Sequence, residues 1–237
     1  MGSKKRVLLK LTGQMLSGQN GNILDIKPVE KIRTQIKELK DSYDFAIVIG
    51  GGNILRGEQQ GKKLGLSLSL GHQAGMLATM INGLILKDIF EQQDIKTQLL
   101  SSIVCPQICD SISQDNIEKA FQENKTLIFV GGTGAPFFTT DTNAIVRALQ
   151  IKATQVWKGT NIDGVYSADP NKDANATAIK KINYSDAISQ KLGIMDATAL
   201  ILAQKHRITI RVFNIFEDNA LIKASQNQQF GSVISNV

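Results

Sequence analysis

The chain has 237 residues, enough for one large domain or two small ones with a sizeable core. Hydrophobic residues make up 42% of it, which excludes a disordered chain, and no apolar run reaches transmembrane length. The net charge is +6, but the basic residues are scattered and aromatic residues are only 5%, which argues against a nucleic-acid groove.

The two cysteines, Cys105 and Cys109, stand four residues apart with no nearby histidine or second cysteine pair. This spacing indicates neither a metal site nor a disulfide framework, so we expect reduced thiols with a packing role. Cys109, in a predicted loop, is also a candidate for reactivity. No signal peptide opens the sequence, and we therefore expect a cytoplasmic protein with no membrane or nucleic-acid partner.

Apolar runs typical of buried strands alternate with segments of helical periodicity along the chain. The expected strands lie at 7–11, 45–49, 97–100, 126–130, 154–158, 209–213 and 232–235. Helices are expected to begin at Pro28 and Tyr184, and to cover 73–92, 117–124, 142–150, 196–206 and 218–226. This alternation predicts a mostly parallel sheet with helices on both faces, and any division into lobes is expected near Gly159. The helix at 73–92 is apolar almost all round, which predicts that it is buried on most sides or packed against another subunit.

The segment 131–141 directly follows the strand expected at 126–130. It combines three glycines, a proline, two threonines and Asp141, which we expect to cap the next helix. Similar turns follow two other strands, at 12–13 and 50–52, and the carboxyl ends of parallel strands meet at one edge of a sheet. The three turns therefore predict a site for a polyphosphate or for two phosphate compounds, with a plain tight turn as the alternative for each. Their spacing matches neither the dinucleotide fingerprint nor the Walker A motif.

Two lysines, Lys10 and Lys158, stand at the ends of otherwise apolar strands. A buried lysine needs an anionic partner, so we expect both ammonium groups to face a transferring phosphate, with Asp141 orienting them or holding a metal. Arg56, just after the turn at 50–53, is a second candidate phosphate clamp. The alternatives are that Lys10 lies in solvent on an edge strand and that Asp141 only caps a helix.

These motifs, taken together and in order, make the chain similar to the bacterial-type UMP kinases of the amino acid kinase superfamily over nearly its whole length. The segments that carry the resemblance are 10–13, 48–57, 75–79, 132–141, 163–170, 195–196 and 211–214. The resemblance implies a three-layer α/β/α sandwich around a mostly parallel central sheet. It also implies a single domain over 1–237, with an acceptor lobe at about 1–158 and an ATP lobe at about 159–237.

The activity implied by the resemblance is transfer of the γ-phosphoryl group of ATP to UMP, giving UDP and ADP in pyrimidine nucleotide biosynthesis. Mg²⁺ is expected to arrive with ATP, without a metal site built by the protein alone. The expected catalytic residues are Lys10, Arg56, Asp141 and Lys158. ATP binding is implied for Lys10, Leu11, Thr12, Gly13, Gly52, Arg56, Thr160, Asn161, Tyr166 and Asp169. UMP binding is implied for Gly51, His72, Gly134, Ala135, Pro136, Phe137, Phe138, Thr139, Thr140 and Asp141.

The resemblance further implies a homohexamer that GTP activates and UTP inhibits, with the activator segment at 18–23, where the match is poorest. Two residues depart from the family pattern. Gln14 replaces a glutamate, and His72 replaces an aspartate that accepts hydrogen bonds from the UMP sugar. A neutral imidazole accepts one hydrogen bond where a carboxylate accepts several, so we expect weaker or altered acceptor binding, unless His72 faces solvent.

Two other functions remain as alternatives. One is a kinase of the same superfamily that acts on a carboxylate or carbamate, but the segments 137–141 and 163–166 favour a nucleotide acceptor. The other is a nucleotide-binding storage or regulatory protein that has lost catalysis. Gln14 and His72 are the residues that favour this second alternative, whereas the retained Lys10, Arg56 and Asp141 argue against it.

Overall fold

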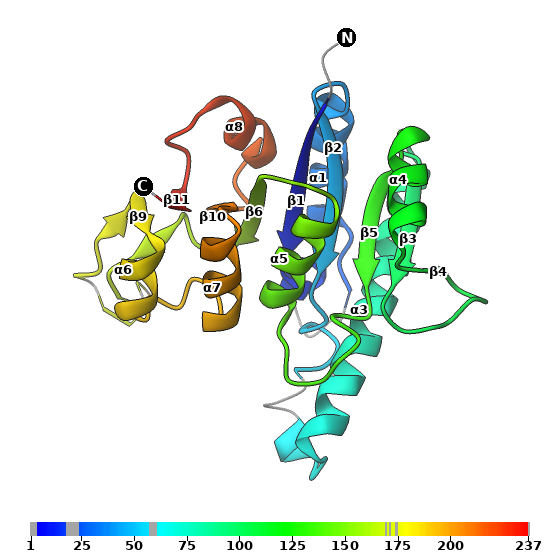
Figure 1. Cartoon of the computed structure of the whole chain (residues 1–237), viewed down its shortest axis with the longest axis horizontal. Helices are drawn as coiled ribbons and strands as arrows, with labels where there is room; N and C mark the ends of the chain where they lie inside the picture. Colours follow the sequence, from blue (N-terminus) through cyan, green and yellow to red (C-terminus); the bar gives the residue numbers. More distant parts are fainter. Residues whose placement is uncertain are drawn as a thin grey trace.

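The computed structural model of the protein describes residues 4–17, 24–56, 61–168, 170, 172–173 and 175–236. Within them a nine-stranded sheet has the order β4-β3-β5-β2-β1-β6-β10-β11-β9, and a small second sheet pairs β7 with β8 (Figure 1). Neighbouring strands of the large sheet are parallel except β10 and β11. The strands are β1 Lys5–Leu11, β2 Tyr43–Ile49, β3 Thr97–Ser101, β4 Asp110–Ser111, β5 Thr126–Val130, β6 Gln155–Thr160, β7 Val165–Tyr166, β8 Ala178–Ile179, β9 Lys181–Asn183, β10 Thr209–Asn214 and β11 Ser232–Ser235.

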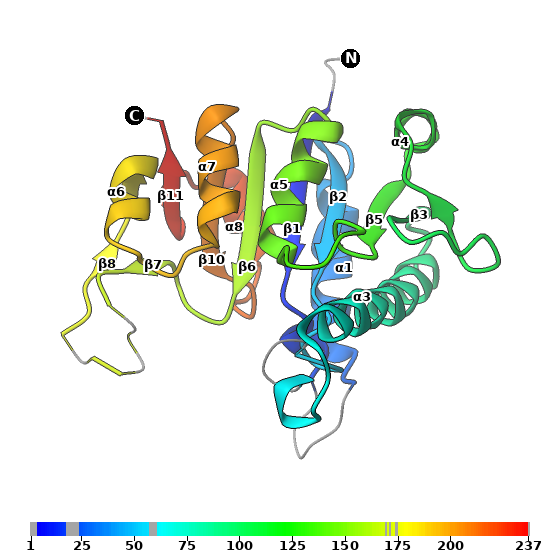
Figure 2. The ribbon, with the colours of Figure 1, turned by 60° about the horizontal axis from the view of Figure 1, so that its bottom comes forward.

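Helices cover both faces of this sheet, as the alternating pattern predicts (Figures 1 and 2). The helices are the short 3₁₀ helix η1 Gly13–Leu16, α1 Lys27–Leu39, α3 Leu68–Glu91, α4 Gln114–Gln122, α5 Thr140–Gln150, α6 Tyr184–Ser189, α7 Ala197–Lys205 and α8 Ala220–Gln226. Apolar residues of α4, α5, α6 and α7 form one buried cluster with the sheet, and those of α1, α3 and α8 form a second cluster. The three-layer α/β/α sandwich is therefore confirmed.

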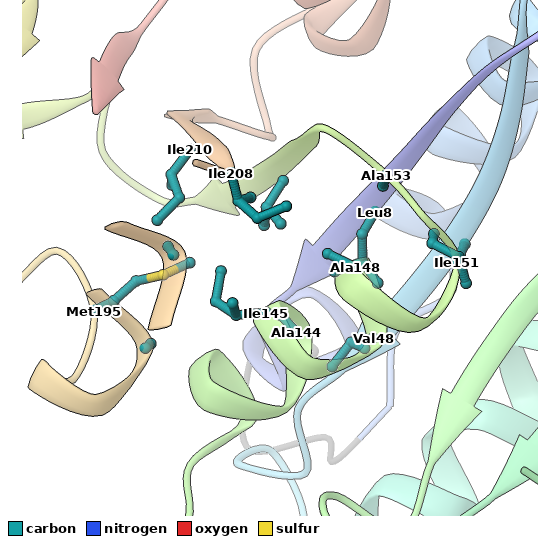
Figure 3. Packing of buried hydrophobic residues seen from close by; sticks show 14 of the residues in the cluster. Leu8, Val48, Ala144, Ile145, Ala148, Ile151, Ala153, Met195, Ile208 and Ile210 are labelled. Atoms are coloured by element: carbon teal, nitrogen blue, oxygen red, sulfur yellow. The ribbon is translucent and has the colours of Figure 1, made fainter. Parts of the chain in front are cut away.

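Side-chain alternation along β1 divides the core between the two layers. Leu8 joins the cluster under α5, whereas Val7 and Leu9 point to the opposite face and join the cluster under α1 and α3. Figure 3 shows Ala144 and Ala148 of α5 lying over this strand. These small residues let α5 lie close to the sheet, and this approach brings the start of α5 near the ends of the strands.

Most expected elements are present, but several begin earlier than expected. The helix α3 begins at Leu68 because the Ser67 side chain accepts a hydrogen bond from the backbone of Leu70. The helix α5 begins at Thr140, and its cap is Thr139. The Thr139 hydroxyl accepts hydrogen bonds from the backbone N–H groups of Asp141 and Thr142. The expectation that Asp141 caps this helix is wrong, and its carboxylate is free for other contacts.

The strand order places a topological switch point between β1 and β6. From β1 the sheet grows in one direction through β2, β5 and β3, and α5 then carries the chain back over the sheet to β6 on the other side of β1. In open α/β sheets ligands bind outside the carboxyl ends of the strands at such a point. Among the described residues no helix has the length and apolar character needed to cross a membrane.

Candidate active site

Two lysines and one aspartate meet at the switch point. Lys10 of β1 and Lys158 of β6 are register partners on adjacent parallel strands. Each ammonium Nζ lies 2.7 Å from one carboxylate oxygen of Asp141, in the first turn of α5. Lys158 also donates a hydrogen bond to the backbone carbonyl of Ile194. Lys10 is buried and not in solvent on an edge strand, so that alternative is wrong.

The cluster carries a net positive charge in a largely dry environment, because two ammonium groups share one carboxylate. Burial alone would raise the pKa of Asp141, but the charges of Lys10 and Lys158 hold it below its ordinary value. Burial lowers the pKa of Lys158, and Asp141 opposes that effect. Asp141 is therefore an ionised side chain that holds two lysines in place at the position where phosphate charge is expected.

Three glycine-rich loops surround the cluster at the carboxyl ends of β1, β2 and β5, as the sequence predicts. Gly13 has to be glycine because an added Cβ would lie 2.7 Å from the carbonyl oxygen of Gly50 and 2.6 Å from Asn53 Oδ1. An added Cβ on Gly51 would lie 2.7 Å from Cβ of Ala78 in α3. The first two loops are therefore packed tightly against each other and against α3, and their glycines Gly13, Gly50, Gly51 and Gly52 line the neighbouring cavity.

A first cavity of about 340 Å³ opens on one side of the cluster. It is lined by Lys10, by the first two loops, by α3 and by the segment after β5. Its lining includes several residues implied in nucleotide binding, namely Lys10, Thr12, Gly13, Gly51, Gly52, His72, Phe138, Thr139 and Thr140. This cavity has the size of a small-ligand site, and Lys10 is the member of the lysine pair that lines it.

A second cavity of about 460 Å³ opens on the other side, beyond β6. It is lined by Lys158 and by Thr160, Asn161 and Tyr166, three of the residues implied in ATP binding, whereas Lys10, Thr12, Gly13 and Gly52 line the first cavity. Because Lys10 lines one cavity and Lys158 the other, their shared Asp141 marks the junction between them. The arrangement suits two phosphate compounds bound end to end.

The segment after β5 is held in an uncommon conformation at the mouth of the first cavity. Phe137 has φ of 71°, a left-handed value that costs a bulky residue on the order of 1–3 kcal/mol. Its ring packs against that of His72, with 5.3 Å between the ring centroids. His72 therefore lines the cavity instead of facing solvent only, and the strained Phe137 is presented beside it.

Some contacts that hold this segment were not anticipated from the sequence. The carboxylate of Asp196, the cap of α7, accepts hydrogen bonds from Thr139 Oγ1 at 2.5 Å and Thr142 Oγ1 at 2.8 Å. Arg147 donates to Ser102 Oγ at 2.7 Å and to the carbonyl of Gly132 at 3.3 Å, and burial lowers its pKa to about 10. The capping pattern at Asp196 was the available signal, whereas nothing local in the sequence points to Arg147.

Other expected site residues lie at the rim or outside the described part. Arg56 is exposed beside Gly52, with its Cγ 3.8 Å from the place of an added Cβ there. Gly134, Ala135, Pro136 and Phe137 belong to the segment after β5 but line neither cavity. Asp169 and the expected activator segment at 18–23 lie outside the described residues.

The acidic groups of the site do not build a metal cage. Both oxygens of Asp141 face lysines, and those of Asp196 accept from threonine hydroxyls. Across the described ranges no three metal-ligating side chains gather at one point. Because hard cations such as Mg²⁺ prefer several free oxygen ligands, we derive no step through a metal held by the protein.

Burial raises the pKa of the Cys109 thiol, and the neighbouring Cys105 adds to the effect. A thiol with a raised pKa is a poor nucleophile, and both cysteines pack against the core cluster under α1 and α3. This favours the packing role over reactivity.

The topology and the charge cluster define an α/β phosphotransferase in which two nucleotide-sized cavities meet at a lysine pair. The sequence model of the amino acid kinase family matches residues 5–214, and the chain belongs to this family. A relative from Mycoplasma genitalium, called uridylate kinase, is 43% identical over 98% of this chain and 96% of its own. A relative of the same name from Thermotoga petrophila is 41% identical over 97% of this chain and 98% of its own.

Solved structures agree with these sequence relatives. The crystal structure of UMP kinase from Ureaplasma parvum superposes with a TM-score of 0.94 and 36% identity, over 99% of this chain and 100% of that one. The UMP kinase of Bacillus anthracis gives a TM-score of 0.93 and 30% identity, over 98% and 96% of the two chains. The likeness therefore includes the whole fold around both cavities.

Proposed function

We propose that the protein is a UMP kinase, which transfers the γ-phosphoryl group of ATP to UMP in pyrimidine nucleotide biosynthesis. The observation that carries this proposal is the Lys10–Asp141–Lys158 cluster at the junction of two nucleotide-sized cavities. The similarity to proteins named uridylate kinase along nearly the full chain supports the choice of UMP as acceptor.

In this proposal the first cavity binds UMP and the second binds the adenosine of ATP. The loops at 12–13 and 50–52 supply backbone N–H groups to phosphate oxygens, assisted by Arg56 at the rim. UMP lies against Gly51, His72 and the 134–141 segment, and adenine lies near Thr160, Asn161 and Tyr166. The division into an acceptor lobe and an ATP lobe then falls close to Gly159, beside Lys158.

The reaction itself needs no covalent intermediate with the protein. A phosphate oxygen of UMP attacks the γ-phosphorus of ATP, a P–O bond forms to UMP, and the bond to the β-phosphate oxygen breaks to release ADP. The attacking phosphate is largely dianionic at neutral pH, since its second pKa is about 6, so it needs no general base. Lys10 and Lys158 stabilise the negative charge that shifts between the two nucleotides in the transition state.

Asp141 acts in this scheme by positioning the lysines. Its lowered pKa and its two ammonium neighbours make it a poor proton acceptor at neutral pH. It fixes the distance between Lys10 and Lys158 before substrates arrive, so the transition state meets charges that are already in place. Mg²⁺ is proposed to accompany the ATP phosphates, where it neutralises part of their charge.

Self-association is proposed through α3. This helix keeps Leu70, Leu77, Ile81 and Leu84 exposed along one stripe, with Leu77 53% exposed. A continuous apolar stripe on a 24-residue helix is typical of a protein interface, and a second copy of the chain is the proposed occupant within a homohexamer. GTP activation, UTP inhibition and a cytoplasmic location belong to the same proposal.

The proposal is tested by following ADP formation with ATP and Mg²⁺, and with UMP, CMP, dUMP, acetylglutamate, carbamate or no acceptor. Fast turnover with UMP alone is the expected result. Turnover with acetylglutamate or carbamate instead would identify another kinase of the family, and ATP binding without turnover would identify a storage or regulatory protein.

A further inference from the structure

The buried face of α3 carries two polar side chains, Thr79 and Asn82, while its other buried residues are apolar or glycine. They are 3% and 0% exposed, and their three-residue spacing places them on the same face. Burying a hydroxyl and an amide is unfavourable unless each finds specific hydrogen-bond partners. Both side chains find these partners in or beside the glycine-rich loops of the first cavity.

Thr79 holds the loop that follows β5. Its Oγ1 accepts a hydrogen bond of 2.9 Å from the N–H of Gly131 and donates one of 2.7 Å to the carbonyl of Met76. The close approach depends on Gly83, where an added Cβ would lie 2.2 Å from Cγ1 of Val130. Because α3 lies directly against the end of β5, the hydroxyl reaches the first residue of the loop.

Asn82 holds the loop that follows β2. Its Nδ2 donates to the carbonyl of Gly50 at 2.7 Å and to Oδ1 of Asn53 at 2.7 Å. Asn53 donates back to Oδ1 of Asn82 at 3.1 Å, so the two amides form a reciprocal pair. Ala78, the residue before Thr79, contacts the same loop, since an added Cβ on Gly51 would lie 2.7 Å from its Cβ.

We propose that Thr79 and Asn82 are positioning residues for acceptor binding, which set the separation between the loops after β2 and β5, both of which line the first cavity. The inference rests on the proposed function, because it takes this cavity as the UMP site. One turn of one rigid helix fixes both loops, so the cavity is shaped before the nucleotide enters. Loops that had to be ordered on binding would lower the affinity for UMP, because the entropy of ordering opposes association.

The test is a pair of matched threonine variants. Thr79→Val keeps the shape of the side chain and removes the hydroxyl that holds Gly131. Thr97→Val is the control, because Thr97 is similarly buried at 5% exposure and its hydroxyl donates to Glu91 at 2.7 Å. Thr97 is the first residue of β3, so it lies at the amino ends of the strands, away from the glycine-rich loops. Thr79→Ser, which restores the hydroxyl, and Asn82→Ser, which removes both amide hydrogen bonds to the loop after β2, complete the set.

Steady-state kinetics with UMP and ATP varied separately give the readout. We expect Thr79→Val and Asn82→Ser to raise the KM for UMP by about tenfold. In Thr79→Val the KM for ATP should change by less than about twofold, because Thr79 holds the loop after β5 and not the loop that contains Gly52. Thr79→Ser and Thr97→Val are expected to keep the wild-type KM for UMP. Equal changes in both KM values of Thr79→Val, or a Thr79→Val enzyme with unchanged KM for UMP, would overturn the inference. Failure of the wild-type protein to phosphorylate UMP would instead overturn the proposed function.

Discussion

Lys10 and Lys158 occupy the same register position on adjacent parallel strands, and both ammonium groups contact the carboxylate of Asp141. Two ammonium groups that share one carboxylate would repel each other if the carboxylate were absent. The position also coincides with the switch point of the sheet, where the chain leaves one side of β1 for the other. The fold thus delivers two cations to one point, and α5 supplies the anion that keeps them there.

Replacing Asp141 by asparagine is expected to destabilise the protein by about 3–5 kcal/mol, because it leaves two largely buried ammonium groups without their counter-charge. Urea unfolding at pH 7 measures this loss. The control is Asp186→Asn, which removes an exposed carboxylate in the first turn of α6 and is expected to cost far less. Equal losses in the two variants would contradict a special role for Asp141.

Stability is expected to depend on pH through the same group. The pKa of Asp141 is lowered from 3.8 in the folded protein, so its contribution is complete above that value and is lost as pH falls below it toward the folded-state pKa. The difference in unfolding free energy between wild type and Asp141→Asn should therefore shrink as pH is lowered from 6 to about 3. Urea unfolding at several pH values checks this, and a difference independent of pH would contradict it.

Charge stabilisation by Lys158 is expected to appear in kcat. Lys158→Met should lower kcat by roughly 10²- to 10³-fold, as removal of one transition-state donor does in other enzymes. Lys5→Met is the matched control, since Lys5 is exposed at the opposite end of β1 and is expected to keep wild-type kcat. Rates of ADP formation at saturating ATP and UMP give the comparison. A normal kcat in Lys158→Met would show that Lys158 does not stabilise the transition state.

Much of this site could be predicted from the sequence because its parts are local. Glycine-rich turns after apolar runs, and lysines at strand ends, predict a phosphate-binding site at the carboxyl ends of the strands. This prediction does not require knowing which strands pair with one another. The strand at 126–130 and the final strand at 232–235 lie where the sequence predicts them. The register between Lys10 and Lys158 was not predictable in this way, because it depends on strands almost 150 positions apart in the chain.

The misplaced helix cap shows a second limit. Both Thr139 and Asp141 are good capping residues, and propensity alone favours neither. The two lysines decide the outcome, because they draw the Asp141 carboxylate toward the sheet and leave the cap to Thr139. The short strands β4, β7, β8 and β9 were likewise not expected, since two or three residues carry too little periodicity to be recognised.

His72 is expected to limit acceptor affinity. His72→Asp should lower the KM for UMP by roughly fivefold, about 1 kcal/mol, because a charge-assisted hydrogen bond to the sugar replaces a neutral one. Gln73→Asp is the control, as it adds the same charge one residue further on, at an exposed position. Steady-state kinetics with UMP and dUMP separate sugar recognition from a general charge effect. An unchanged or higher KM for UMP in His72→Asp would show that the imidazole does not bind the UMP sugar more weakly than a carboxylate.

A charge on the exposed stripe of α3 is expected to break the proposed assembly. Ile81→Asp places a carboxylate at a position that is 46% exposed in the single chain and would be buried against a second copy. Ile201→Asp on α7 is the matched control, because Ile201 is 54% exposed and lies outside the stripe. Light scattering should give the mass of an oligomer for wild type and Ile201→Asp, and a smaller mass for Ile81→Asp. A wild-type mass of one subunit would rule out the interface. An Ile81→Asp protein that keeps the full oligomeric mass would place the contact on another surface.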